Sequence, residues 1–357
     1  MTFTELFTPA AIAAHWTEVA SNKINYIGSA LFPAAKKTGL DLKWFKGSKG
    51  LPVSLMPTAF DAKATFRDRP GMTVTETEMP FFREGFKIKE HDRQELLRVL
   101  DSNDPYAVEV MNRLFDDADE LINGANVVPE RMIMQLLFAD SGNAGISFTA
   151  NGVNYTYNYD PASAWKSTNY FALASNLWTT PLTSDPFTDL KTAKDAVKNK
   201  TGEDATIAIM NSLTFNLMAQ SDAIRSRFLS TTGRAVGYIS DADVAQIVKD
   251  LIGVTVVVYD KQYKNESGTA AKFVPDYYVA LVPEGPLGRT WYGTTPEEAD
   301  LMGKVSDAKV SVVNTGVAVT QIIDAHPVNV NTFASEIVLP SWERMDSCAL
   351  LKVGSAS

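Results

Sequence analysis

The chain has 357 residues, of which 45% are hydrophobic and 21% charged, and its formal net charge is −9. This composition predicts a folded protein of about two domains, and the acidic balance argues against binding to nucleic-acid phosphates. A single cysteine, Cys348, excludes an internal disulfide. No stretch reaches the roughly 18 apolar residues of a membrane helix, so we expect a protein of a reducing cytoplasm with no membrane segment.

Residues 1–35 predict an arm with one short helix. Thr8 suits the N-cap and Pro9 the first helical position. Ile12, Trp16 and Val19 then fall on one helical face. Residues 25–32 are predicted to be extended.

Residues 36–101 differ in charge from the rest of the chain. Residues 36–100 hold 13 of the 33 Lys and Arg residues but only 9 of the 42 Asp and Glu residues, a net charge of +4 against −13 elsewhere. β-Branched runs and a turn signal at residues 69–71 predict a hairpin-like excursion with few core residues. We expect it to lie on a neighbouring subunit, through Lys43, Lys46, Lys49, Lys63, Arg67 and Arg69. The alternative, held equal, is that these charges only keep an exposed loop soluble.

Residues 104–123 carry the strongest helical pattern of the chain. Asp104 suits the N-cap, and Val108, Met111 and Phe115 are expected to anchor the helix on a sheet. A second helical run, residues 129–139, begins at a proline. The Asn-Gly pair at 123–124 and this proline predict a break between the two runs.

The remainder alternates strands and helices. An Asn-Gly pair at 151–152 predicts a hairpin across residues 146–159. Residues 187–300 are expected to form a compact α/β unit, with helices at 187–200, 212–219 and 241–251 and strands at 205–210, 254–259 and 277–282. Further strands are predicted at 310–313, continued by 317–323, at 334–339, ended by Pro340, and at 349–353.

The titratable residues do not form a catalytic pattern. His15, His91 and His326 are far apart and lack metal-ligand spacing. Cys348 has no histidine near it in the sequence, so a buried structural thiol is favoured over a nucleophile. No glycine-rich phosphate loop is present. We therefore assign no catalytic, cofactor-binding or metal-binding residue.

Two polar clusters have a weaker alternative function. Asp116, Asp117 and Asp119 are candidates for a divalent cation, but helical spacing spreads them around a turn, so solvation is favoured. Tyr155 and Tyr157, with Tyr159, share one strand face on which bases could stack. Because basic residues do not accompany them, a packing face is favoured.

The C-terminal third carries a family resemblance. The run from His326 to Asp346, HPVNVNTFASEIVLPSWERMD, resembles the C-terminal signature of major capsid proteins of tailed phages, in the lambda-like capsid protein E family. Residues 350–353 and the stretch RTWYG at 289–293 resemble further family segments. The resemblance implies an α+β, Hong Kong 97-like phage capsid fold. Its parts would be an N-terminal arm (1–35), an E-loop (36–101), a P-domain with spine helix and β-hairpin (102–186) and returning strands (301–357), and an A-domain (187–300).

The resemblance also implies a function and partners. Hexamers and pentamers of this chain would form an icosahedral head shell that encloses double-stranded DNA passively. Separate scaffolding and portal proteins are expected, and decoration proteins are left open. The protein would be made in the host cytoplasm and end in the virion, with no enzyme activity and no cofactor. The alternatives are a phage tail or baseplate protein and, less favoured, an α/β hydrolase-type enzyme, for which no nucleophile–base pair is found.

Overall fold

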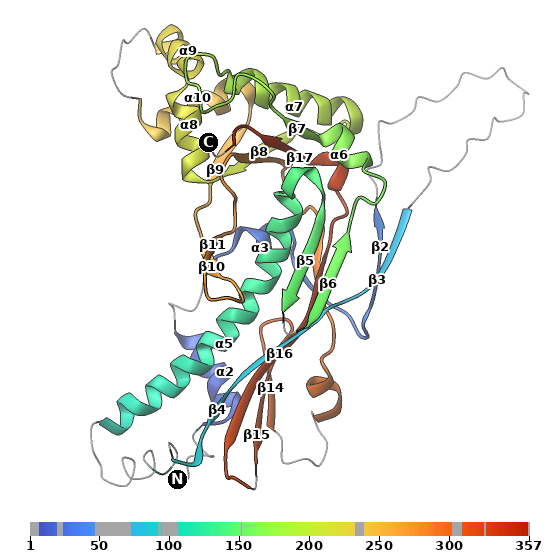
Figure 1. The fold of residues 1–357 in the computed structure, drawn as a ribbon, viewed down its shortest axis with the longest axis vertical. Helices are drawn as coiled ribbons and strands as arrows, with labels where there is room; N and C mark the ends of the chain where they lie inside the picture. The colour runs from blue at the N-terminus through green and yellow to red at the C-terminus, as the bar shows by residue number, and fades with distance from the viewer. Residues whose placement is uncertain are drawn as a thin grey trace, which may run out of the picture. The chain divides into compact units, whose positions relative to one another are not determined.

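The computed structural model describes residues 7–19, 24–46, 73–91, 94, 106–150, 152–232, 239–301, 309–324 and 326–355 (Figure 1). The chain divides into two compact units, each built from separate stretches. Unit 1 comprises residues 1–43, 76–132 and 289–341, and unit 2 comprises residues 44–75, 133–288 and 342–357. The predicted boundaries between arm, E-loop, P-domain and A-domain are a different division and stay a prediction.

Unit 1 is organised around a six-stranded sheet in the order β1-β13-β16-β15-β14, with β4 also paired to β16. The strands of this sheet are β1 (Ala34–Lys36), β4 (Phe81–Ile88), β13 (Arg289–Tyr292), β14 (Lys309–Val313), β15 (Val317–Ile323) and β16 (Val330–Ser341). The other elements of this part of the chain are α2 (Pro9–Glu18), α3 (Ile27–Leu31), η3 (Glu297–Leu301), and the paired strands β2 (Asp41–Lys46) and β3 (Thr73–Glu78). β14 and β15 form a hairpin, so the single continuous run predicted for 310–323 is wrong.

Strand β16 continues through Pro340, which was predicted to end it. Pro340 lies opposite Thr290 of β13. Three residues earlier in β16, the Ile337 carbonyl accepts the Gly293 N–H, so the backbone polar groups of Ile337 point toward β13. The alternation of ladder bonds then places the missing N–H of Pro340 on the side away from β13. On that side the ladder with β4 has already ended at Ile337. The proline therefore removes no ladder bond.

The segment after residue 36 contributes more to the core than predicted. β4 pairs with β16 over eight residues. Leu42, Trp44, Met79 and Ile88 are buried. The expectation of few core residues is therefore wrong for the described part of this segment. Charged residues within β4 hid its strand character, because pairing depends on the partner strand more than on local preference.

Helix α5 (Tyr106–Leu137) is one continuous helix, as Figure 1 shows. The predicted break between residues 123 and 129 is therefore wrong. Inside a helix a glycine costs about 1 kcal/mol and a proline such as Pro129 about 3 kcal/mol, and the helix buries Ala118, Ile122 and Met132. Burial of that face outweighs the local preference. The predicted cap Asp104 lies outside the described residues.

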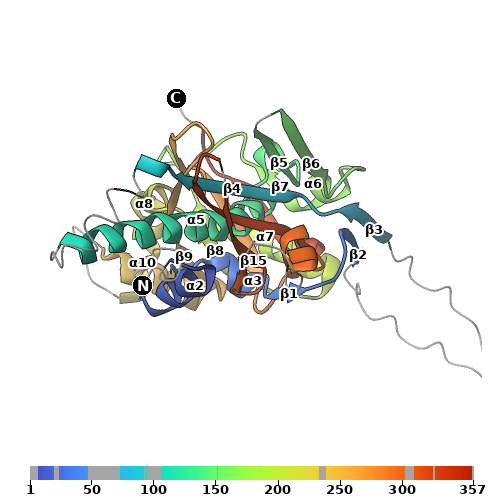
Figure 2. The same ribbon diagram turned by 90° about the horizontal axis from the view of Figure 1, so that it is seen from below.

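Helix α2 packs on the part of α5 that belongs to unit 1. Thr8 caps α2 as predicted, its hydroxyl accepting from Ala11 N–H at 3.2 Å. One cluster joins α2, and Phe7 two residues ahead of it, to α5 and to the sheet. Its buried members are Phe7, Ile12, Trp16, Ile88, Ala118, Ile122, Val313, Val319 and Val330. Phe115 packs against this cluster, as predicted, whereas the side chains of Val108 and Met111 lie outside the described ones. Figure 2 shows α2 beside α5.

Unit 2 contains a five-stranded sheet in the order β7-β17-β12-β8-β9. Its strands are β7 (Tyr170–Ala172), β8 (Ala205–Met210), β9 (Thr255–Val258), β12 (Tyr278–Pro283) and β17 (Ala349–Lys352). Two hairpins add β5 (Gly145–Ala150) with β6 (Val153–Asn158) and β10 (Gln262–Lys264) with β11 (Ala270–Lys272). The helices are α6 (Ala164–Asn169), α7 (Pro186–Thr201), α8 (Ser212–Gln220), α9 (Asp222–Thr232) and α10 (Asp241–Ile252), with short 3-10 turns η2 (Asp140–Gly142) and η4 (Met345–Ser347).

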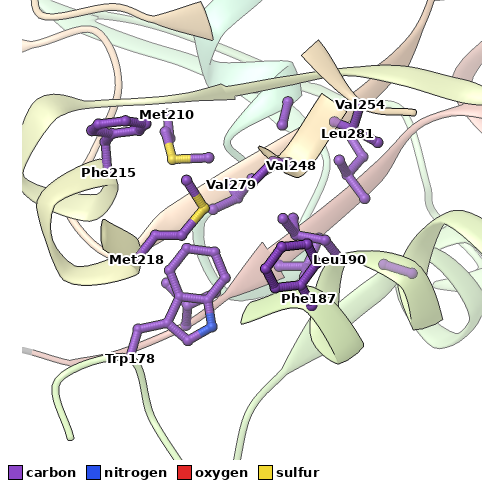
Figure 3. Packing of buried hydrophobic residues seen from close by; sticks show 14 of the residues in the cluster. Trp178, Phe187, Leu190, Met210, Phe215, Met218, Val248, Val254, Val279 and Leu281 are labelled. Carbon is purple, nitrogen blue, oxygen red and sulfur yellow. The ribbon is translucent and has the colours of Figure 1, made fainter. Parts of the chain in front are cut away.

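The core of unit 2 lies between this sheet and helices α7, α8 and α10 (Figure 3). All six residues of β12 are buried. Trp178, Phe187 and Leu190 pack with Met218 and Leu281 in one cluster. The helices and strands predicted between residues 187 and 282 are confirmed to within a few residues, whereas α9 and the short strands β10 and β11 were not predicted. No helix in the described part of the chain is both long and apolar enough to cross a membrane.

We expect Leu281→Ala to lower the free energy of unfolding by about 2–5 kcal/mol, because it leaves a cavity in a fully buried strand. Leu182→Ala is the matched control. Leu182 is 84% exposed, so its loss should change stability by less than about 0.5 kcal/mol. Denaturant midpoints of the full chain measure both, and equal midpoints would contradict the packing described.

We expect Trp16→Ala to weaken the docking of α2 by about 3–5 kcal/mol, since Trp16 fills the cluster on α5. Hydrogen exchange of the α2 amides, such as Ile12 N–H bonded to Thr8 carbonyl at 2.9 Å, reports the docking. Thr17→Ala, on the exposed side of α2, should leave exchange unchanged. Unaltered protection in the Trp16 variant would contradict the prediction.

Candidate assembly surfaces

The six basic residues predicted to contact a neighbour are described only in part. Lys43 lies exposed on β2, and its ammonium is 2.6 Å from the Glu76 carboxylate on β3. The hydrogen bond that Lys43 donates to Glu76, and then the charge of that carboxylate, raise the pKa of Lys43. Lys46 lies in β2 with its side chain outside the described ones, and Lys49, Lys63, Arg67 and Arg69 lie outside the described residues. The contact through these residues stays a prediction.

The C-terminal motif at 326–353 forms strands in both units. Its first half becomes β16 in unit 1, and its second half becomes η4 and β17 in unit 2. Within unit 2, the Trp342 ring lies 5.5 Å from the Trp165 ring. Arg344 donates to the Glu203 carboxylate at 2.8 Å and to the Glu284 and Pro286 carbonyls at 3.1 Å. The motif therefore serves packing and the fixing of turns.

The earlier motif, residues 289–293, has a steric reason for its glycine. A Cβ added to Gly293 would lie 2.7 Å from the Ile337 side chain of β16. Gly293 also donates its N–H to the Ile337 carbonyl at 2.9 Å. Only glycine lets the end of β13 approach β16 this closely.

A buried polar contact joins the arm to α5. His15 Nδ1 is 3.0 Å from Asp119 Oδ2, and the His15 ring stacks on Phe115 at 4.9 Å. Trp16 Nε1 donates to Asn123 Oδ1 at 3.4 Å. Asp119 is only 4% exposed, so the prediction that it is solvated is wrong. Asp119 is four residues from Phe115 and three from Ile122, so it lies on the same helix face as these apolar residues. That spacing could have predicted its burial.

The other acidic residues of this helix are exposed. Asp116, Asp117 and Glu120 lie on the open side of α5. Partial burial raises the pKa of Asp117, and the charges of Glu120 and Asp116 add to the rise. The described residues contain no group of three side chains arranged to hold a metal ion.

Glu130 of α5 holds the second helix of the arm. This carboxylate is 2% exposed, and it accepts the Gly28 N–H at 2.9 Å. It therefore satisfies a free donor at the N-terminus of α3. Residues 27–31 are helical, so the prediction that they are extended is wrong. The local sequence could not show this, because the stabilising partner Glu130 lies 102 residues away.

Two ion pairs attach η3 to the sheet of unit 1. Glu297 pairs with Arg83 of β4 and accepts the Ser335 hydroxyl of β16 at 3.0 Å. Glu298 pairs with Lys36 of β1. Sequence analysis did not single out these residues, because their partners are separated by up to 262 positions.

The remaining titratable candidates are not arranged for catalysis. Cys348 is buried, as predicted, and burial raises the pKa of its thiol to about 12. The thiol is therefore protonated at neutral pH and is a poor nucleophile. His326 lies on the exposed surface next to β16, and His91 is also exposed. Tyr159 is buried and Tyr155 and Tyr157 are partly buried, in agreement with a packing face.

Comparison with known proteins connects these features. A family model described as phage major capsid protein E matches residues 8–353. A phage-related protein from Bordetella bronchiseptica RB50 is 16% identical, with a TM-score of 0.55, over 97% of this chain and 96% of its own. A protein assigned as a prophage capsid protein of E. coli CFT073 is 14% identical, with a TM-score of 0.60, over 98% of this chain and 99% of its own. No curated protein matches the chain.

The family match covers nearly the whole chain, and the structural matches show the same fold. The α+β, Hong Kong 97-like capsid fold predicted from the sequence is confirmed. The protein is a head shell protein that self-assembles, its location is the virion, and its family is a structural one. A tail or baseplate protein and a hydrolase are not favoured. This chain therefore belongs to the phage major capsid protein E family.

Proposed function

We propose that this chain assembles into hexamers and pentamers that close as an icosahedral head around packaged double-stranded DNA. The observation that carries the proposal is the family match across residues 8–353. Because the chain has a formal net charge of −9, it would enclose the DNA as a passive wall rather than bind DNA phosphates. Separate scaffolding and portal proteins would guide assembly after synthesis in the host cytoplasm, and a decoration protein is a further partner to seek.

Within this proposal, each segment of the chain forms a different domain of the subunit. Residues 102–186 and 301–357 would form the P-domain and residues 187–300 the A-domain. Residues 1–35 would be the arm, and residues 36–101 the E-loop that reaches an adjacent subunit. A closed shell needs the same chain in slightly different surroundings, so rigid sheets and extended connections suit it.

The basic side chains of the E-loop would lie on an acidic surface of the neighbour. Lys43 has a partner in its own chain, Glu76, so the contact would depend mainly on Lys46, Lys49, Lys63, Arg67 and Arg69. Exposed ion pairs contribute about 0–1 kcal/mol each. Repetition around a shell would multiply that small contribution.

Imaging of the purified full chain tests the shell. We expect closed particles or ring-shaped capsomers in negative-stain micrographs, since the chain carries the capsid fold. Sedimentation velocity measures the size of the assemblies in the same sample. Tubes would support a tail protein instead, and a species that stays a small monomer at all concentrations would contradict the proposal.

Charge reversal tests the contact of the E-loop. We expect Lys49→Glu, Lys63→Glu and Arg67→Glu together to reduce the yield of closed particles, because each replaces attraction with repulsion at the neighbour. The control reverses the same number of exposed charges elsewhere, at Lys191, Lys249 and Lys264. Circular dichroism checks that both variants fold. Normal assembly of the loop variant, or an equal loss in the control, would contradict the contact.

A further inference from the structure

Glu336 occupies an unusual place for a carboxyl group. It lies within β16, the strand of unit 1 that pairs with β15, β4 and β13. Its side chain is 1% exposed. Removing a carboxylate from water without compensation is costly enough that such groups are normally paired or neutral.

The register of the sheet defines what surrounds Glu336. Side chains alternate along a strand, so Glu336 shares its face with Val330, and Val330 belongs to the cluster formed with α2 and α5. Phe82 of β4 lies directly opposite Glu336. Tyr292 of β13 lies opposite Val338, two residues further along the same face. The immediate neighbours known from the register are therefore apolar or aromatic.

Neither carboxyl oxygen of Glu336 has a hydrogen-bond partner among the described residues. The other buried glutamates of unit 1 differ in this respect. Glu130 accepts the Gly28 N–H, and Glu297 pairs with Arg83 and Ser335. Glu130 and Glu297 therefore have polar partners inside unit 1, whereas Glu336 is buried without one among the described residues. Burial raises the pKa of Glu336 well above its ordinary value. Burial, and then the charge of Glu336, raise the pKa of Tyr292.

The charged and titratable groups on the elements around this face do not neutralise Glu336. They include Glu84 on β4, Tyr292 on β13, Lys309 on β14, His15 on α2, and Asp119, Glu130 and Arg131 on α5. Desolvation is the sole cause of the shift at Glu336. Asp119 and Glu130 are engaged by His15 and Gly28, and Glu84 is exposed.

We propose that Glu336 is a proton-dependent conformational switch of unit 1: it is protonated while buried under this packing, and loss of the proton favours opening of the β4–β16 region. The switch belongs to the single chain and does not depend on shell assembly. In a shell it would make the conformation of every subunit respond to pH.

The sign of the effect follows from linkage. The folded chain holds the Glu336 proton more tightly than the unfolded chain, whose glutamate pKa is about 4.3. The stabilisation is therefore complete below about pH 4.3 and is lost as pH rises through the raised folded pKa. Within that window the unfolding equilibrium should shift about tenfold per pH unit because of this one group.

The experiment compares the full-length wild type with Glu336→Gln, a neutral side chain of the same shape. The unfolding equilibrium is measured from pH 4.5 to 8, together with hydrogen exchange of the β4 and β16 amides. We expect the tenfold dependence and faster exchange at high pH in the wild type, and the loss of both in the variant. Glu84→Gln, at an exposed position on the same sheet face, should behave as the wild type.

A second variant and a spectroscopic measurement test the proposal even if Glu336→Gln does not fold. If Glu336→Gln does not fold, Glu336→Met supplies a second neutral side chain. The infrared carbonyl band of a protonated carboxylic acid, measured on the wild type at neutral pH with glutamate isotope labelling, needs no variant. Equal pH dependence in wild type and variant, or the absence of that band, would overturn the proposal. Because particle formation is scored separately by imaging, failure of the switch is distinguishable from failure of the shell.

Discussion

The pairing of both edges of strand β16 is the constraint on which unit 1 depends. A strand of twelve residues presents more backbone donors and acceptors than any single neighbour satisfies. β15 and β4 pair with its first part and β13 with its last part. These three partners come from residues 81–88, 289–292 and 317–323, so one strand brings together segments that are far apart in the sequence. The need to satisfy this backbone explains why β4 is a strand although its side chains are mixed.

Buried carboxylates then attach the less regular segments to the sheet and helix of unit 1. Glu130 fixes α3, Asp119 contacts His15 of α2, and Glu297 joins η3 to β4 and β16. A buried pair of this kind adds geometric definition more than net stability, because desolvation offsets much of the attraction. The apolar cluster around Trp16 supplies the larger stabilisation of the arm. Glu336 is the exception, since it has burial without a partner in the described part of unit 1.

Unit 2 depends on a simpler principle. Its sheet buries the whole of β12 between neighbours, and α7, α8 and α10 cover it with amphipathic faces. The C-terminal motif ends here as β17, which pairs with β12 and β7. Membership of a capsid family gives this arrangement its meaning, because the same unit is repeated in every subunit of a shell.

The sequence by itself determined the family, through residues 326–353, and most elements of unit 2. There, helix caps, the period of apolar residues and the Asn-Gly turn are local signals that agree with the packing. It also predicted the buried thiol of Cys348. Only the tertiary structure decided the helical state of residues 27–31, the continuity of α5, the passage of β16 through Pro340 and the burial of Asp119. In each case the deciding partner lies far along the chain. Contacts with it outweigh a local preference of about 1 kcal/mol, or of about 3 kcal/mol for Pro129 inside α5.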